Sequence, residues 1–491
     1  SEIKGTKGDN DGIALAGIYI TGTAKLIDDG TAPVLVTSVP AEGATNASAN
    51  GKIVLAFDEK VKLTDNAKAS LDGKTVEGVV SGKTITFAYK GLSYATAYTF
   101  TLTAGSVADL TENAIANDIT IHFSTKEKPA VTKALYDVIV TSGEEFAAAI
   151  DAANKRTDTS KRFRIFVKQG DYKIPASKTA TKISNTDKKT YPDPTTYLNT
   201  PNVSIIGEGN DNTALTNTVP NVEADNGYGI ANILEGIGTG DVLDLNSGAT
   251  GTYFQDIKMY SSMGDKKGRD IVLNDKSSKT ICKNVNLWAY QDTYVSNNNN
   301  DGRFYFEGGI LRGNTDYLCG KGDVYYNNVD LVMCGTGYLA VPSLPTKYGY
   351  IFKDCTIKDG SKEGINGKYT LGRPWGKGTP IALFIDTKME VIPTAAGWDE
   401  MSGGYPKRFA EYNSTTATGT TVDLSGRKQV YDAYDAKDGN NYTNRRNETA
   451  ESPVLTADEA AFYTIENVLG GDDDWDPTAA TEQASAPTHV K

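Results

Sequence analysis

The stretch ICKNVNLWAYQDTYVSNNNNDGRFYFEGGILRGNTDYLCGKGDVYYNNVDL, residues 281–331, contains one short pattern three times. The copies are ICKNVNL (281–287), YFEGGIL (305–311) and YYNNVDL (325–331). Gln291-Asp292-Thr293 follows the first copy and Asn314-Thr315-Asp316 follows the second, so each aspartate lies 11 residues after the start of its own copy. This shared offset predicts that Asp292 and Asp316 occupy equivalent places in successive structural repeats.

The pattern recurs on both sides of this stretch, in YFQDIKM (253–259), IFKDCTI (351–357) and LFIDTKM (383–389). The six starts are 20 to 32 residues apart, a period that indicates a stacked-repeat architecture. Leucine-rich repeats share the period, but their fixed Asn and Leu positions are absent, and the β-branched and aromatic residues favour strands. The sequence therefore predicts a parallel β-helix with one coil per repeat.

The segments before the repeats predict how the β-helix starts. SGEEFAAAIDAANKR (142–156) has a capping serine, acidic residues in its first turn and apolar residues at helical spacing, so we expect a helix that caps the coils. RFRIFVKQGDYKI (162–174) is expected to be a strand that ends in a Gly-Asp turn.

The N-terminal part alternates apolar and polar residues between turn signals, as in KIVLAFDEKV and DITIHFSTK. About seven short strands over residues 33–127 predict an immunoglobulin-like β-sandwich, either a spacer or a weak carbohydrate-binding module. We expect 1–32 to be a leader or the remnant of an upstream domain, 126–133 to be a linker, 134–478 to be the β-helix and 479–491 to be a polar tail. The predicted class is all-β throughout.

Composition excludes several kinds of function. The chain has two histidines, which argues against a Ser-His-Asp triad or a multi-histidine zinc site, so we expect no metal and no cofactor. A net charge of −12 argues against nucleic acid as a partner, and no run of 18 apolar residues could span a membrane. Catalysis must then rest on carboxylates, amides, Arg, Lys or Tyr.

The offset of the two aspartates has a chemical consequence. Equivalent positions in successive coils of a β-helix lie about 4.8 Å apart, and two carboxylates that close titrate as a unit, with one pKa raised and the other lowered. One can then act as an acid and the other as a nucleophile or base. The alternative is that both are ordinary turn aspartates.

LGRPWGKG (371–378) places Arg373 and Trp375 in a loop rich in Gly and Pro. Arg373 suits a carboxylate clamp and Trp375 a sugar-stacking face, although a structural arginine and a core tryptophan remain the alternative. The Gln291 amide could donate to a developing oxyanion, or be surface.

Three segments carry a resemblance to a known family: Tyr290-Gln291-Asp292-Thr293, Gly313-x-x-Asp316-Tyr317-x-x-Gly320 and Leu371-Gly372-Arg373-Pro374-Trp375. They resemble the signature segments of pectin methylesterases, and Gly397-Trp398 with Glu411-Tyr412-Asn413 looks like a fourth. The similarity runs from about 135 to 478. It implies a right-handed parallel β-helix and hydrolysis of the C6 methyl esters of galacturonate in pectin, with release of methanol.

The resemblance also implies residue roles. Asp316 matches the nucleophile, Asp292 the general acid and base, Gln291 an oxyanion-stabilising amide and Arg373 the residue that keeps the nucleophile ionised. The residues that match or lie beside substrate-binding positions are Trp375, Tyr172, Tyr290, Tyr317 and Arg269.

The chain departs from the family pattern in three places. The early Gly-x-Tyr-x-Glu is Gly170-Asp171-Tyr172-Lys173-Ile174, and Phe-x-Phe-Gly after the nucleophile is Tyr317-Leu318-Cys319-Gly320. The glutamine that usually lies about 22 residues before Gln291 is Arg269 here. Either Arg269 completes the oxyanion hole, or a shifted Asn274 does, or the hole is weaker.

The four cysteines have different offsets in the repeats, and three coils separate Cys282 from Cys355, about 14 Å and too far for a disulfide. We expect mostly free cysteines buried in the β-helix interior. Two other functions stay open: a retaining glycosidase, which also uses two close carboxylates, and a non-catalytic carbohydrate-binding β-helix. The expected setting is secreted, periplasmic or cell-surface in a bacterium, with the chain a monomer acting on pectin.

Overall fold

The computed structural model describes residues 30–49, 51–127, 136–184, 187–224, 229–234, 236–265, 268–298 and 300–478. Most of the expected leader and linker, and the whole tail 479–491, lie outside the described residues. The chain divides into two compact units, 1–128 and 129–491, which are described separately.

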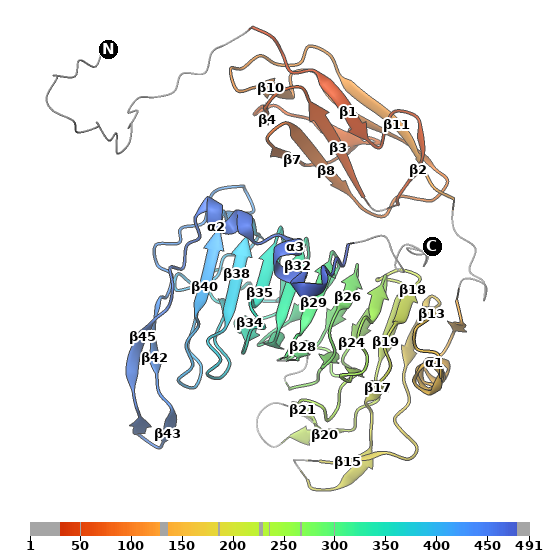
Figure 1. Ribbon diagram of the computed structural model, residues 1–491, viewed down its shortest axis with the longest axis vertical. Helices are drawn as coiled ribbons and strands as arrows, with labels where there is room; N and C mark the ends of the chain where they lie inside the picture. Colours follow the sequence, from red (N-terminus) through yellow and green to blue (C-terminus); the bar gives the residue numbers. More distant parts are fainter. Residues whose placement is uncertain are drawn as a thin grey trace, which may run out of the picture. The chain divides into compact units, whose positions relative to one another are not determined.

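The N-terminal unit is a β-sandwich (Figure 1). One sheet has the order β1-β3-β8-β7, the other has the order β2-β11-β9-β5-β6, and β10 pairs with β4. Alternate residues of β3 point into the core, where Ile53, Leu55 and Phe57 are buried. The sandwich prediction is confirmed, but the described part contains eleven strands rather than about seven, because turns and bulges divide the edges into short pieces. The strands are β1 Leu35–Val39, β2 Ala44–Ala47, β3 Gly51–Phe57, β4 Val61–Leu63, β5 Ala69–Leu71, β6 Lys74–Thr75, β7 Gly78–Ser81, β8 Thr84–Tyr89, β9 Ala97–Leu102, β10 Val107–Asp109 and β11 Ile119–Thr125.

The C-terminal unit is a parallel β-helix, in which each central coil contributes one strand to each of three sheets and the end coils contribute to fewer. The ten-stranded sheet contains β12 Val138–Val140, β13 Phe163–Val167, β18 Val203–Gly207, β23 Tyr253–Gln255, β26 Thr280–Lys283, β29 Arg303–Glu307, β32 Asp323–Asn327, β35 Tyr350–Lys353, β38 Ile381–Ile385 and β40 Arg408–Tyr412. The nine-stranded sheet contains β14 Gly170–Lys173, β19 Thr213–Thr216, β24 Lys258–Tyr260, β27 Asn286–Trp288, β30 Ile310–Gly313, β33 Asp330–Met333, β36 Thr356–Asp359, β39 Lys388–Met389 and β41 Thr415–Thr416. The seven-stranded sheet contains β17 Thr196–Leu198, β22 Leu243–Leu245, β25 Leu273–Asp275, β28 Tyr294–Asn297, β31 Leu318–Lys321, β34 Tyr338–Pro342 and β37 Thr370–Gly372.

The repeated sequence pattern is the corner between the ten-stranded and nine-stranded sheets. Its Asn, Asp or Gly is the first of two corner residues and has a positive φ, for example 54° at Asn284 and 55° at Asn328. Gly, Asn and Asp tolerate this left-handed conformation better than other residues, which explains why they recur at this position. The last coil has the same corner at Asn413, with φ 51°, in a segment that the six predicted copies do not include.

The interior is filled by columns of side chains in register from coil to coil. Phe306, Tyr326, Phe352 and Phe384 form one such column, with successive ring centroids 5.1, 4.6 and 4.2 Å apart. Aromatic pairs of this kind add about 0.5–1.5 kcal/mol each beyond the area they bury, so the column ties four coils together.

Both ends of the stack are covered. The predicted helix is α1, Gly143–Lys155, whose N-cap Ser142 accepts a hydrogen bond from the Glu145 backbone, and it lies at the β13 end (Figure 1). Beyond the other end, β42 Val430–Ala433 pairs with β45 Arg446–Thr449, and β43 Ala436–Asp438 pairs with β44 Asn441–Thr443. Near this end, the buried Arg427 and Glu411 form an ion pair with Nε and Oε1 2.5 Å apart.

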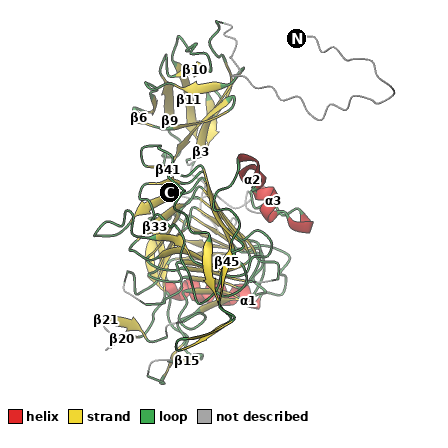
Figure 2. Cartoon of the chain, turned by 90° about the vertical axis from the view of Figure 1, so that its left-hand side faces the viewer, coloured by secondary structure: helices red, strands yellow, loops and turns green. Residues whose placement is uncertain are grey.

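The short helices α2 Ala457–Phe462 and α3 Ile465–Leu469, with the 3-10 turn η1 Gly471–Asp473, follow the last coil (Figure 2). α3 and η1 pack against the outer face of the ten-stranded sheet, where Arg303 donates to the Leu469 and Gly470 carbonyls. Among the described residues, no helix has the length and apolar character needed to cross a membrane.

The early coils contain two inserted hairpins, and one segment there differs from the sequence-based prediction. The hairpins β15 Thr181–Ile183 with β16 Thr190–Pro192, and β20 Asn221–Ala224 with β21 Gly229–Asn232, both lie between a strand of the nine-stranded sheet and the next strand of the seven-stranded sheet. The predicted Gly170-Asp171 turn is wrong, because both residues begin β14 and pair with Thr213 and Ala214.

Candidate functional site

Asp292 and Asp316 lie side by side where the chain passes from the nine-stranded to the seven-stranded sheet. Tyr294 on β28 pairs with Leu318 on β31, and each aspartate lies two residues before its strand residue, so the two are one rung apart. Both have positive φ values, 57° and 50°, and both are nearly buried. The two carboxylates line one cavity of about 130 Å³ together with Arg269, Gln291 and Trp375.

Arg373 grips Asp316 with two parallel contacts. Its Nε donates to Asp316 Oδ1 at 3.1 Å and its Nη2 donates to Oδ2 at 2.6 Å. Burial lowers the pKa of Arg373, but the hydrogen bonds and charge of Asp316 outweigh this and raise it above its ordinary value. A permanently charged, two-point donor holds both oxygens of the carboxylate in one orientation.

The Arg373 guanidinium stacks on the Tyr338 ring. The guanidinium lies 3.8 Å from the centroid of the Tyr338 ring, and the Tyr338 hydroxyl donates to Asp399 Oδ2 at 2.9 Å. A planar guanidinium stacked on an aromatic face keeps its donor fork in one orientation. This support could not be predicted, because Tyr338 belongs to no sequence motif and Asp399 lies in an irregular segment.

Asp292 has different surroundings. Arg269 Nε lies 3.0 Å from Asp292 Oδ2, and the Cys319 thiol donates to Oδ1 with a sulfur–oxygen distance of 3.6 Å. The Arg269 side chain is 42% exposed, so this ion pair faces the solvent end of the cavity, whereas Cys319 is 3% exposed. The two carboxylates therefore differ: Asp316 is held by two contacts from the partly buried Arg373, and Asp292 lies between the more exposed Arg269 and a thiol.

Gln291 lies between two neighbours along the coil axis. Its backbone forms bridges to Arg269 in the preceding coil and to Thr315 in the following one. Arg269 therefore occupies the position beside Gln291 that the sequence spacing indicated. Asn274, the other candidate, instead donates to Asp241 at 3.0 Å and to Asp244 at 3.2 Å, and it does not line the cavity.

An apolar wall closes the cavity on the side away from the charges. It contains residues from five separate segments: Ile237, Cys319, Val341, Trp375 and Met401. Cys319 and Val341 pair directly on β31 and β34. Of the wall residues, Ile237, Val341 and Met401 carried no functional signal in the sequence. A small buried space with carboxylates on one side and apolar groups on the other suits an uncharged group of a substrate.

The three tyrosines expected near substrate are not brought into this cavity. Tyr317 is fully buried in the β-helix interior, and this removes it from the set of substrate contacts. Tyr172 packs against the interior core on β14, several coils from Asp316, and its hydroxyl donates to the Gln169 carbonyl at 2.8 Å. Tyr290 is partly exposed at the corner, and its carbonyl accepts from Asn314 at 2.8 Å.

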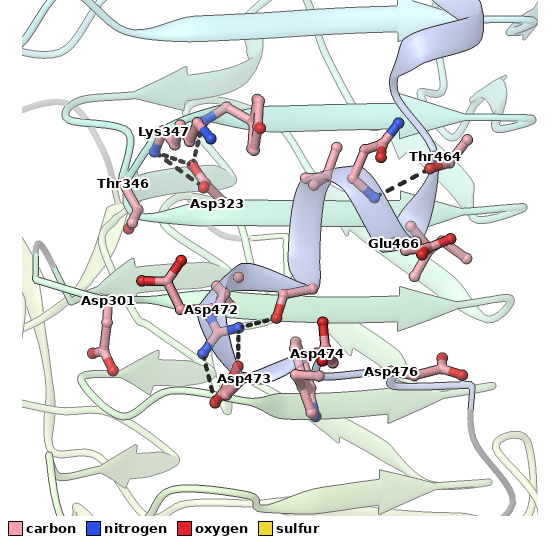
Figure 3. Close-up of a pocket in the computed structure, with 18 of the residues that line it drawn as sticks. Asp301, Asp323, Thr346, Lys347, Thr464, Glu466, Asp472, Asp473, Asp474 and Asp476 are labelled. Atoms are coloured by element: carbon pink, nitrogen blue, oxygen red, sulfur yellow. Dashed lines mark hydrogen bonds and ion pairs between the residues drawn. The ribbon is translucent and has the colours of Figure 1, made fainter.

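A larger cavity of about 1090 Å³ lies on the outer face of the ten-stranded sheet, under the segment 464–478 (Figure 3). Its carboxylates are held for structural reasons: Asp473 pairs with Arg303 at 2.7 Å, and Asp323 accepts from the Lys347 backbone at 3.0 Å. It contains no pair of carboxylates gripped as Asp292 and Asp316 are, so we place the reactive site on the other side of the coil.

All four cysteines in the described part of the chain are free, as predicted. Cys282 and Cys355 are buried in the interior core, and Cys334 is half-buried. The interior placement is wrong for Cys319, which lies on the outer face of its strand and lines the cavity, because the left-handed turn at Asp316 changes which residues of β31 face inward.

Comparison with known proteins identifies the relatives of both units. The bacterial Ig-like domain family model matches residues 29–125, and the pectinesterase family model matches residues 137–448. A putative pectinesterase/pectinesterase inhibitor 26 of Arabidopsis thaliana is 24% identical over 293 residues, which cover 57% of this chain and 26% of that protein. A probable pectinesterase A of Aspergillus flavus is 30% identical over 138 residues, 28% of this chain and 41% of that protein.

The matched segments thus span less than half the length of these relatives. Among solved structures, pectin methylesterase PemA from Erwinia chrysanthemi has 21% identity and a TM-score of 0.49, with 71% of this chain and 99% of that chain covered. Pectin methylesterase from carrot has 17% identity and a TM-score of 0.49, with 70% and 95% covered. The pectinesterase family model matches well over half of the 491 residues, so the chain belongs to the pectinesterase family.

Proposed function

We propose that the chain is a carbohydrate esterase that hydrolyses the C6 methyl esters of galacturonate in pectin and releases methanol. The observation that carries this proposal is the pairing of Asp316 with Arg373 through two hydrogen bonds, beside a second buried carboxylate in the same cavity. This arrangement supplies an ionised nucleophile and a separate acid/base, and its chemistry requires no histidine.

In the first half of the reaction, an Asp316 oxygen attacks the ester carbonyl carbon and the carbonyl oxygen becomes an oxyanion. The Gln291 amide donates to that oxyanion, and Arg269, beside it in the preceding coil, offers a cationic donor in the position of the family's missing glutamine. The C–O bond to the methoxy group breaks as protonated Asp292 gives its proton to the departing methanol, and an acyl anhydride with Asp316 remains.

In the second half, Asp292, now ionised, takes a proton from a water molecule, and the resulting hydroxide attacks the anhydride carbonyl. The Asp316 carboxylate leaves, the galacturonic acid carboxyl group is formed and releases its proton to the solvent, and Asp292 again carries a proton. The ester hydrolysed is thereby converted into one methanol and one carboxylic group, and both aspartates return to their starting states.

The direct test uses methylated pectin and two readouts, methanol and new reducing ends. Methanol without reducing ends supports the esterase. The close carboxylate pair is also compatible with a retaining glycosidase, for which reducing ends would appear instead. The absence of both products would indicate a non-catalytic carbohydrate-binding β-helix.

A matched pair of variants locates the activity. Asp316→Asn should abolish methanol release while the protein stays folded. Asp330→Asn is the control. Asp330 is an aspartate of the nine-stranded sheet that does not line the cavity, and its Oδ2 lies 3.0 Å from Lys358 Nζ. Methanol release by Asp316→Asn at the rate of the control would overturn the assignment of the nucleophile.

We also propose that Arg269 acts on the oxyanion rather than as a plain ion-pair partner. Arg269→Gln keeps an N–H donor beside Gln291 and should retain most of the methanol release, whereas Arg269→Ala should lose about tenfold or more in kcat. Equal rates for the two variants would count against this role.

The substrate suggests where the protein works. Pectin is a polymer outside the cell, and the N-terminal unit matches a bacterial Ig-like domain, so we propose a secreted, periplasmic or cell-surface protein that acts as a monomer. Recovery of the protein only from the cytoplasm of fractionated producing cells, or as a stable oligomer on sedimentation, would contradict this.

A further inference from the structure

We propose that Cys319 is a positioning residue for the acid/base of the reaction: its thiol holds the Asp292 carboxylate by donating a hydrogen bond to Oδ1. The role of Cys319 in catalysis rests on the proposed function. The hydrogen bond between Cys319 and Asp292 does not depend on that function. Cys334 and Cys355 donate instead to backbone carbonyls, of Val332 and of Tyr326 and Lys353.

The position of Cys319 on β31 places the thiol against Asp292 and away from the core. Cys319 pairs with Val295 of the preceding coil and with Val341 of the following coil, so its neighbours along the outer face are apolar. The sulfur donates a hydrogen bond to Asp292 Oδ1 at 3.6 Å. The side chain is 3% exposed, which limits competition from water for this contact.

The thiol is kept in the protonated form that can donate. Burial is the main cause that raises the pKa of Cys319 well above its ordinary value, and the charges of Asp292 and Asp316 raise it further. Cys319 is therefore a neutral donor at working pH. It is not a nucleophile, because nucleophilic attack requires the thiolate.

A thiol suits this place because Asp292 must change its protonation state twice in each turnover. A hydrogen-bonding group that can only donate, such as the guanidinium beside Oδ2, opposes protonation of the carboxylate. A thiol donates to the ionised carboxylate and can accept weakly from the protonated one, so Cys319 can keep Oδ1 in place in both states.

Three variants of Cys319 test this with methylated pectin as substrate. Cys319→Val and Cys319→Ala remove the donor, and we expect kcat to fall about fivefold, with KM little changed, because one weak hydrogen bond to a charged group is lost. Loss of a donor to the ionised form also favours the protonated form, so the basic limb of the pH profile should move to higher pH. Cys319→Ser keeps a donor and acceptor and should restore both quantities.

Val295→Ala is the packing control. Val295 is buried in the adjacent coil of the same column, and it does not line the cavity. This variant should lose stability but keep the kcat and the pH profile of the unaltered protein. Wild-type kcat and an unmoved basic limb in Cys319→Val would overturn the proposal, and so would a serine variant as impaired as the valine variant.

An infrared measurement separates this inference from the proposed function. The S–H stretching bands lie in a region free of other protein bands, and Cys319→Ser identifies the band of this thiol by removing it. Asp292→Asn should shift that band to higher frequency, because a carboxylate is a stronger acceptor than an amide. An unshifted band would refute the contact itself, whether or not the protein releases methanol from pectin.

Discussion

Replacing Arg373 with lysine tests the two-point grip on Asp316. The arginine donates from two nitrogens, at 3.1 and 2.6 Å, and lysine carries its charge on one nitrogen that can reproduce only one of these contacts. A hydrogen bond to a charged group contributes about 1.5–3 kcal/mol, so the loss of one should lower kcat/KM about 10- to 150-fold. The lysine cannot reproduce the planar stack on Tyr338 either, which would move the loss toward the upper end.

The assay is the initial rate of methanol release from highly methylated pectin, with folding checked by the thermal midpoint. Arg303→Lys is the matched control, because Arg303 grips Asp473 in the same two-point manner, at 2.7 and 3.2 Å, on the outer face of another sheet. The control should keep its full activity. A rate for Arg373→Lys within threefold of the unaltered protein, with both variants folded, would refute the reasoning that the fork geometry organises the nucleophile.

Three further outcomes are expected, each from a separate feature. Glu411→Gln leaves the buried Arg427 without its counter-charge and should lower the free energy of unfolding by about 3–5 kcal/mol in urea denaturation; a loss below about 1 kcal/mol would contradict this. Burial raises the pKa of Asp275 to about 6, above the value of about 3.9 in an unfolded chain, so its contribution to stability is present at low pH and is lost as the pH rises through about 4 to 6. Asp275→Asn should therefore gain stability relative to the unaltered protein by about 3 kcal/mol between pH 4 and 7, and a parallel pH dependence of the two proteins would sink the idea. Titration of the unfolded chain without reductant should find four free thiols, whereas two or none would disprove the absence of disulfides.

The repeating part of the fold was predictable because one residue in each coil has a fixed conformational demand. A left-handed corner favours Asn, Asp or Gly, so one of these residues recurs at the corner position of the repeated sequence pattern. The equal offset of Asp292 and Asp316 then follows from the stacking of coils. The place of Arg269 beside Gln291 was indicated instead by the match to the family pattern, and the two backbones form a bridge in successive coils.

The apolar wall and the support of Arg373 could not be predicted, because they are formed by residues far apart in the chain with no shared spacing. Tyr317 shows a second limit. Its place beside Asp316 suggested a substrate contact, but the left-handed turn at Asp316 directs Tyr317 inward and Cys319 outward. Side-chain direction after such a turn depends on backbone geometry, which alternation along a strand does not convey.

The two kinds of corner in the β-helix differ in how much change they allow. From β23 onward, the corner between the ten-stranded and nine-stranded sheets has two residues in every coil. The corner that carries Asp292 and Asp316 already admits the two hairpins at 181–192 and 221–232 in earlier coils without disturbing the register of the sheets. Variation in length is thus directed to the edge of the reactive cavity, and a designer who wished to alter the substrates admitted could graft new loops there while leaving the scaffold untouched.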